Sequence, residues 1–139
     1  NKKMKGILQT LELMLANHEP YPAIVLDWEW NILMGNQAFQ KILDWIQSTH
    51  VHFSNSKNIV ELIFDPNGLK PFITNWEDVA SVTIQRLHRE RMENKMRHKA
   101  LLERLFCYPD IPLQWKKMDF KSMKKQKSTN TRFLKNIEN

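Results

Sequence analysis

The segment of residues 19–39 restricts the fold of this chain more than any other stretch of the sequence. Two apolar runs, residues 23–26 and 32–35, are joined by a more polar turn, which is the pattern of a β-hairpin. Asn36 follows directly and has the side chain of a helix N-cap, with an oxygen in reach of the free amides two or three positions further on. The segment therefore predicts two short antiparallel strands followed at once by a capped helix.

Apolar residues recur at helical spacing before this segment and after it. The longest of these stretches opens with two acids, Glu77 and Asp78, which suit the positive end of a helix dipole. The predicted helices cover residues 2–17, 37–47, 59–64, 76–94, a stretch around 101–106 and a short one at 112–118, with one extra turn at 69–73. Together with the hairpin they predict an α+β fold, in which several helices cover a small antiparallel sheet.

The positive charge of the chain is concentrated at its C-terminal end. The net charge is +6, yet residues 1–115 are neutral and residues 116–139 hold eight Lys or Arg against two acids. We therefore divide the chain into a domain at 1–120, which begins with a linker helix, and a segment at 121–139. That segment is predicted to be basic and mobile, or to form incomplete C-terminal strands. Direct binding of nucleic-acid phosphates by this Lys-rich run is one alternative function.

The single cysteine, Cys107, excludes an internal disulfide and fits a reducing cytoplasm. We expect it to be a small buried apolar residue on a helix. No apolar stretch approaches the roughly twenty residues of a membrane span, and no signal peptide is visible. The expected location is the cytoplasm.

Patterns typical of catalysis or metal binding are weak in this sequence. His50 and His52 could share one side of a strand, but no carboxylate or cysteine stands near them to complete a metal site. His88 and His98 fall in a highly charged stretch and are expected on the surface. The acids within residues 27–29 are better explained by a turn than by acid–base chemistry. The expectation is a protein that is not an enzyme and that has no metal and no cofactor.

Large apolar side chains are the stronger signal. The chain has 42% hydrophobic residues, and its five tryptophans are many for 139 residues. Such side chains come from several predicted helices, where they form either an ordinary filled core or the lining of a cavity for a small apolar ligand. The residues predicted to line such a ligand site are Trp45, Phe64, Phe72, Trp76, Ile84, Leu87 and Trp115.

The order of the motifs resembles the MmyB-like (MltR-type) ligand-binding domain over about residues 5–120. In that family the pattern P-A-x-V-L-x-x-x-W-x-V-L-x-x-N-x-x-A opens a PAS-like fold. Residues 58–66 resemble the family's N-x-x-x-x-x-F-x-D-P, one residue shorter, and residues 75–80 resemble its D-W-E-x-x-A with Asn75 for the Asp. The positions at or near the first pattern are Pro22, Ala23, Val25, Leu26, Trp30, Ile32, Leu33, Asn36 and, one place off, Ala38.

The resemblance implies a sensory domain that follows a helix-turn-helix DNA-binding domain of the XRE type in bacterial transcription regulators. It also implies a pocket for fatty-acid-like ligands, and a sheet completed by strands where this chain has its Lys-rich run. We therefore expect the sensor half of a longer regulator. A bound apolar ligand would bias one arrangement, and the linker helix at 2–17 would pass this bias to the DNA-binding domain. The alternative is a ligand-free protein-interaction or dimerisation domain with a filled core, and a homodimer is left open.

Overall fold

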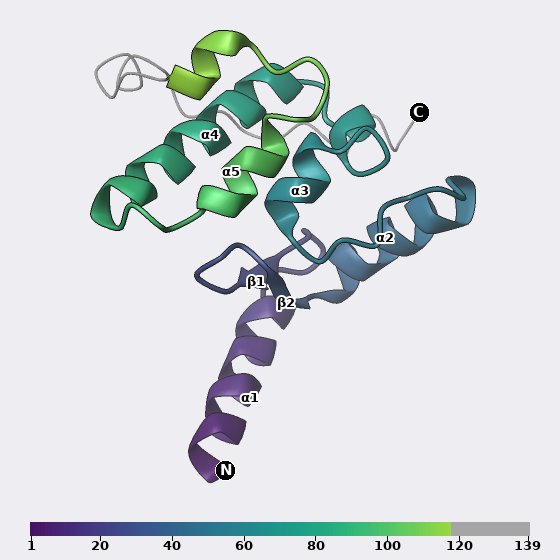
Figure 1. Cartoon of the computed structure of the whole chain (residues 1–139). Helices are drawn as coiled ribbons and strands as arrows, with labels where there is room; N and C mark the ends of the chain where they lie inside the picture. The colour runs from purple at the N-terminus through teal and green to yellow at the C-terminus, as the bar shows by residue number, and fades with distance from the viewer. Residues whose placement is uncertain (118–139) are drawn as a thin grey trace. The chain divides into compact units, whose positions relative to one another are not determined.

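The computed structural model describes residues 1–117, which form an α+β protein (Figure 1). The predicted fold class is confirmed, and each predicted helix agrees with the observed one to within two residues at either end. The predicted segment 121–139 lies outside the described residues. The elements in chain order are α1 (Lys2–Ala16), β1 (Ile24–Leu26), β2 (Ile32–Gly35), α2 (Gln37–Thr49), α3 (Ile59–Phe64), the 3-10 helix η1 (Lys70–Phe72), α4 (Trp76–Glu93), α5 (Lys99–Leu105) and the 3-10 helix η2 (Leu113–Lys117).

The chain divides into two compact units, Asn1–Ile59 and Val60–Asn139. The first unit holds α1, the hairpin of β1 and β2, and α2. The second unit holds α3 from its second residue onward, followed by η1, α4, α5 and η2.

In the first unit, β1 and β2 pair antiparallel in a register that sets Ile24 opposite Gly35, with an irregularity between Val25 and Leu26. The carboxylate of Asp27 organises the turn between the strands. Its Oδ1 accepts hydrogen bonds from the amides of Glu29 at 2.9 Å and Asn31 at 2.8 Å. The bond from the Asn31 amide is the main reason that the pKa of Asp27 lies below its ordinary value. The expectation that Asp27 serves a turn is confirmed.

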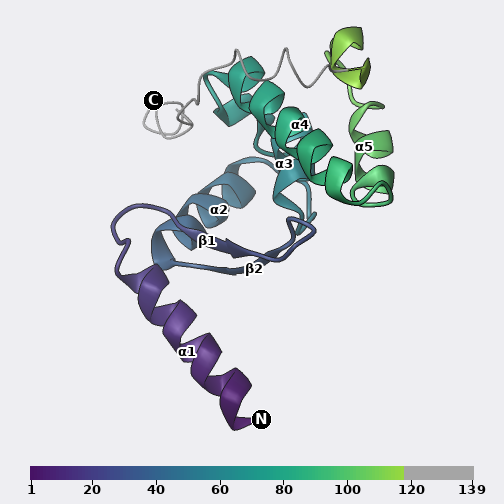
Figure 2. The ribbon, with the colours of Figure 1, turned by 90° about the vertical axis from the view of Figure 1, so that its left-hand side faces the viewer.

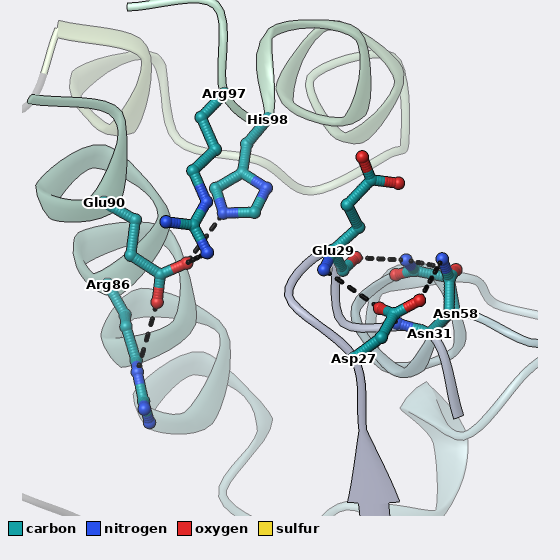
Figure 3. Close-up of polar contacts among 8 residues, drawn as sticks. All are labelled: Asp27, Glu29, Asn31, Asn58, Arg86, Glu90, Arg97 and His98. Atoms are coloured by element: carbon teal, nitrogen blue, oxygen red, sulfur yellow. Dashed lines mark hydrogen bonds and ion pairs between the residues drawn. The ribbon is translucent and has the colours of Figure 1, made fainter. Parts of the chain in front are cut away.

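A second set of polar contacts fastens this turn to residues just before α3. Figure 3 shows Asn58 beside the turn, where its side-chain amide donates to the carbonyl of Glu29 at 2.9 Å and to the Asn31 side chain at 3.1 Å. The backbones of Asn31 and Asn58 also form an isolated antiparallel bridge. The two-residue contact supplies the short hairpin with a third segment of chain, which two isolated strands need for stability.

Asn36 joins three parts of the first unit through one buried side chain. Its Oδ1 accepts from the Phe39 amide at 3.0 Å, which caps α2 as predicted, and from the Ala23 amide at 3.1 Å. Its Nδ2 donates to the carbonyls of Tyr21 at 2.7 Å and Leu15 at 3.2 Å. The side-chain amide of Asn36 therefore donates two hydrogen bonds and accepts two, which satisfies both its nitrogen and its oxygen.

A glutamate outside α2 satisfies the two amides that Asn36 does not reach. Glu19 accepts from the amides of Gln37 and Ala38, one with each carboxylate oxygen, both at 3.0 Å. The negative charge is favourable at this end of the helix because the helix dipole is positive there. Three consecutive amides at the start of α2 are therefore bound by side chains.

The apolar face of α1 is largely exposed. In the first unit, α1 meets the hairpin at its C-terminal end and extends away from it and from α2 (Figures 1 and 2). Leu15, near that end, is buried. The exposed large apolar side chains of α1 are Met4, Ile7, Leu8, Leu13 and Met14.

The second unit contains a core contributed by all of its helices. Its fully buried large side chains include Phe64 of α3, Ile84 and Leu87 of α4, and Leu105 of α5. Gly68 closes the turn after α3, where an added Cβ would lie 2.6 Å from the Leu62 carbonyl oxygen, so a larger residue is not accommodated there. Several residues of the candidate site belong to this core.

Cys107 is a correction to the sequence-based expectation. It lies in the turn that follows α5 and is exposed, rather than buried on a helix. The helix ends at Leu105, two residues before the cysteine, so the apolar spacing of α5 does not extend to Cys107.

Replacing Asn36 tests its role in the first unit. We expect Asn36→Ala to lower the free energy of unfolding by roughly 1–3 kcal/mol, because it leaves buried backbone groups without partners. Asn36→Asp should cost more, since its oxygens would face the carbonyls of Leu15 and Tyr21. Urea denaturation followed by circular dichroism measures both. Asn55→Ala, at an exposed loop position, is the control, and an equal loss in this variant would contradict the assignment.

Candidate ligand-binding site

Six of the seven residues predicted to line a ligand site lie in the second unit. Phe64, Ile84 and Leu87 have no exposed surface, and Phe72 and Trp115 are each 7% exposed. Trp76 is half-buried at the start of α4. The seventh residue, Trp45, belongs to α2 in the first unit, where it is 40% exposed and its ring lies 6.5 Å from that of His50.

Three of these aromatic side chains form a chain of ring contacts centred on Trp76. The ring of Phe64 meets it edge-on at a centroid distance of 5.8 Å, and the ring of Trp115 lies tilted at 6.3 Å. Aromatic pairs at such distances are favourable beyond the area that they bury. We call Phe64, Trp76 and Trp115 the aromatic cluster; it joins α3, the start of α4 and η2.

The Trp76 indole is fixed by a hydrogen bond as well as by packing. Its Nε1 donates to the carbonyl of Ile63 at 2.8 Å, which orients the ring against α3. Lys70 of η1 places its ammonium 4.2 Å from the centroid of the same ring. The side chain of Lys70 is only 16% exposed, and its ammonium lies 3.3 Å from the carboxylate of Asp110, which is 77% exposed. A cation therefore stands beside the aromatic cluster.

The side chain of His88, in α4, contacts the backbone of Trp115. The His88 Nε2 lies 3.2 Å from the Trp115 carbonyl oxygen, and because a carbonyl can only accept, this nitrogen carries the hydrogen. Its ring also stacks with that of Phe106 at 6.3 Å. Burial is the main reason that the pKa of His88 is lowered, and the charge of Arg91 lowers it further, whereas the bond to Trp115 opposes the shift.

His98 is a second correction, because it was expected on the surface and is buried instead. It adopts a left-handed backbone conformation, with φ of 61°, directly before α5. This turn directs its ring back to α4, where Nε2 lies 2.7 Å from a carboxylate oxygen of Glu90 (Figure 3). Arg86 at 3.6 Å and Arg97 at 4.0 Å approach the same carboxylate. The contact fastens the start of α5 to α4.

Candidate metal ligands do not gather in the part of the chain that the structure describes. Within residues 1–117, no group of three or more His, Cys, Asp or Glu side chains is placed to hold a metal ion. His50 and His52 are both exposed, in the first unit. No helix in the described part of the chain has the length and apolar character needed to cross a bilayer. The second unit thus holds a largely buried apolar and aromatic cluster with the Lys70 cation at its margin.

The class of protein to which this chain belongs follows from comparison with known families. The chain belongs to the family of MmyB-like transcription regulator ligand binding domains, whose sequence model matches residues 7–133. Neither the curated proteins nor the solved structures gave a significant match. The chain is therefore a ligand-binding domain of a transcription regulator, and the family is not one of enzymes.

The polar contacts made beside the aromatic cluster could not be predicted from the sequence. Lys70 and Asp110 are forty positions apart, and His88 and Trp115 are 27 apart, so neither pair follows a local spacing. The hydrophobic members, in contrast, followed directly from the apolar spacing of their helices.

The lowered pKa of His88 predicts a dependence of stability on pH. Below pH 6.5, the ordinary pKa of histidine, His88 takes up a proton more readily in the unfolded chain than in the folded one. The contribution of neutral His88 to stability is therefore fully present above pH 6.5 and is lost as the pH falls through its pKa in the folded protein. We expect the melting temperature to fall on acidification and His88→Gln, which keeps a donor for Trp115, to reduce that fall. Differential scanning calorimetry between about pH 5 and pH 8 measures this.

The exposed His52 supplies the matched control. His52→Gln should leave the pH dependence as in the unmodified protein. If both variants give the same curve, the burial of His88 is not the cause of the effect.

Proposed function

We propose that this domain binds a fatty-acid-like ligand against the aromatic cluster of its second unit, and that binding controls a helix-turn-helix DNA-binding domain attached before residue 1. Membership of the regulator ligand-binding family is the observation that carries the proposal. The buried apolar residues Phe72, Ile84 and Leu87 support the apolar character of the ligand, because they would surround an acyl chain without leaving a polar group unpaired. Trp45, the seventh residue expected from the sequence, belongs to the first unit and stays a prediction.

The mechanism that we propose is a shift in population between two arrangements of the domain. A ligand changes such an equilibrium only by the difference in its affinity for the two states. The linker helix, α1, would carry the bias to the DNA-binding domain, and by linkage the DNA would change the affinity for the ligand by the same factor. Since such a regulator acts on DNA, we place it in the bacterial cytoplasm. No cofactor other than the ligand is required.

Lys70 is the residue that we assign to the acidic head group. The Lys70 side chain is mostly buried, its ammonium lies beside the Trp76 ring, and its acidic neighbour Asp110 is largely exposed. Because Asp110 is exposed to water, its ion pair contributes little to stability, so a ligand carboxylate could replace it at small cost. A hydrogen bond to a charged group is worth about 1.5–3 kcal/mol, enough to orient the ligand with its chain toward the cluster.

The alternative is a protein-interaction or dimerisation domain whose core is filled and takes no ligand. The complete burial of Phe64, Ile84 and Leu87 is compatible with it.

Direct nucleic-acid binding by residues 121–139 is the third hypothesis. It predicts salt-sensitive binding that is indifferent to the nucleic-acid sequence and that disappears when these residues are deleted.

Gentle purification followed by denaturing mass spectrometry tests the ligand. We expect a copurifying fatty acid, and a rise in melting temperature when palmitic acid is added to the lipid-free protein, because a ligand that binds the folded state stabilises it. A clean protein whose melting temperature does not respond to fatty acids of any chain length favours the filled-core alternative.

The Lys70→Met variant tests the head-group assignment. We expect an affinity for palmitic acid about tenfold lower or worse, with little change for its methyl ester, which has no charge to pair. Isothermal titration calorimetry with both ligands measures the difference. Lys99→Met, at an exposed position of α5, is the control for loss of one positive charge. An equal loss for acid and ester would show that Lys70 supports the site without contacting the carboxylate.

A further inference from the structure

The turn at residues 65–68, between α3 and η1, contains an asparagine followed by glycine. Asparagine in this sequence readily loses its side-chain amide, because glycine has no Cβ to shield its backbone nitrogen from the preceding side chain. Asn67 is exposed and Gly68 is buried. The other two glycines of the chain follow lysine and methionine, so this pair occurs once.

The fold itself requires the glycine that makes Asn67 reactive. A Cβ added at Gly68 would lie 2.6 Å from the carbonyl oxygen of Leu62 and 3.2 Å from the Cβ of Asp65. A backbone oxygen cannot move aside as the end of a flexible side chain can. A residue that would slow the reaction by its bulk therefore cannot stand at this position.

Hydrogen bonds hold the reacting nitrogen in the closed turn. The Gly68 amide donates to the Asp65 carbonyl at 2.8 Å, and the next amide, that of Leu69, donates to the Leu62 carbonyl at 2.7 Å. The Asn67 amide donates to Oδ1 of Asp65 at 2.8 Å. The Gly68 nitrogen becomes a nucleophile only when it loses its proton, and a buried, hydrogen-bonded amide proton is removed only after local opening.

We propose that Asn67 is a site of spontaneous conversion to isoaspartate, suppressed by the closed turn and permitted when the turn opens. Hydroxide removes the Gly68 amide proton, and the nitrogen attacks Cγ of Asn67. The new N–Cγ bond forms a succinimide ring, the Cγ–Nδ2 bond breaks, and Nδ2 takes a proton from water and leaves as ammonia. Water then opens the ring at either carbonyl, which gives aspartate or isoaspartate.

Isoaspartate at this position is incompatible with the turn. Its main chain runs through Cβ, which inserts one methylene group between residue 67 and Gly68. Gly68 fits closely against the Leu62 carbonyl, so the longer chain displaces it and breaks the bonds of the Gly68 and Leu69 amides. Leu69 is 5% exposed and Phe72 of η1 is 7% exposed, so the displacement reaches the core of the second unit. The released ammonia is lost, and the asparagine is not regenerated.

The rate of conversion in the folded and the unfolded chain tests the protection. The full chain is kept at mildly alkaline pH with and without concentrated urea, and peptides that contain residue 67 are analysed by mass spectrometry and by enzymatic methylation of isoaspartate. We expect conversion at least about tenfold slower in the folded chain, because its rate is the unfolded rate multiplied by the open fraction. Equal rates, or no conversion at Asn67 in urea, overturn the proposal.

Two replacements of Asp65 supply a matched pair that removes the same charge. Asp65→Ala takes away the acceptor for the Asn67 amide and should speed conversion in the folded chain by roughly three- to tenfold. Asp65→Asn keeps an oxygen there and should react more slowly than Asp65→Ala; its own amide is inert, because the proline that follows has no N–H. In urea the two variants should react equally. An Asp65→Ala variant that converts no faster than Asp65→Asn when folded contradicts the proposal.

Asn67→Gln tests the structural consequence. Glutamine would need a larger ring that forms much more slowly, so this variant should stay unconverted under the same conditions. After ageing, the isoaspartate form of the unmodified protein should melt at a lower temperature than fresh protein, whereas aged Asn67→Gln should melt as it did when fresh. No fatty acid is present in these experiments, so they can fail independently of the proposed function. An isoaspartate form that melts with the fresh protein overturns the inference.

Discussion

The buried side chain of Asn36 is the constraint on which the first unit depends. It binds the end of α1, two residues of the segment before β1 and the start of α2, all within 3.2 Å. Each bond replaces water at a backbone group that would otherwise be buried without a partner. Gly35, the residue before it, leaves room for Phe39, since an added Cβ would lie 2.6 Å from that ring. A glycine and an asparagine therefore fix where the hairpin ends and the helix begins.

The second unit is organised differently, around rings rather than around an amide. Trp76 packs against Phe64 and Trp115, and its indole hydrogen bond holds the start of α4 against α3. Dispersion contacts are weak singly and strong together, so truncation of any one of these rings is expected to lower the stability of the second unit. In the function that we propose, the same rings would contact the apolar ligand, and Lys70 would pair with its acidic group.

Local features of this fold could be predicted from the sequence, and non-local ones could not. The hairpin, the Asn36 cap and the bounds of α4 follow from spacing and turn chemistry within a few residues. The Glu19 cap depends on a residue eighteen positions away from the amide that it binds. His98 is buried because a left-handed turn directs it to Glu90, a conformation that helical periodicity does not register.

The residues of the candidate site likewise include some whose burial could be predicted from the sequence and some whose surroundings could not. Apolar spacing identified the buried members of the second unit, such as Ile84 and Leu87, because burial follows the period of the helix. It did not separate Trp45, which is partly exposed in the first unit, from the others. The family motifs were informative because their order extends over most of the chain, and the matched region reaches residue 133.

The central claim, that an acyl chain lies against the aromatic cluster, is tested most directly by nuclear magnetic resonance. Stearic acid that carries a nitroxide on its chain broadens the signals of nearby protons when it binds. The account predicts the strongest broadening at the indole NH signals of Trp76 and Trp115 and at amides of α3, with full recovery after the nitroxide is reduced. Broadening confined to the exposed apolar face of α1, or none at saturating ligand, would contradict it.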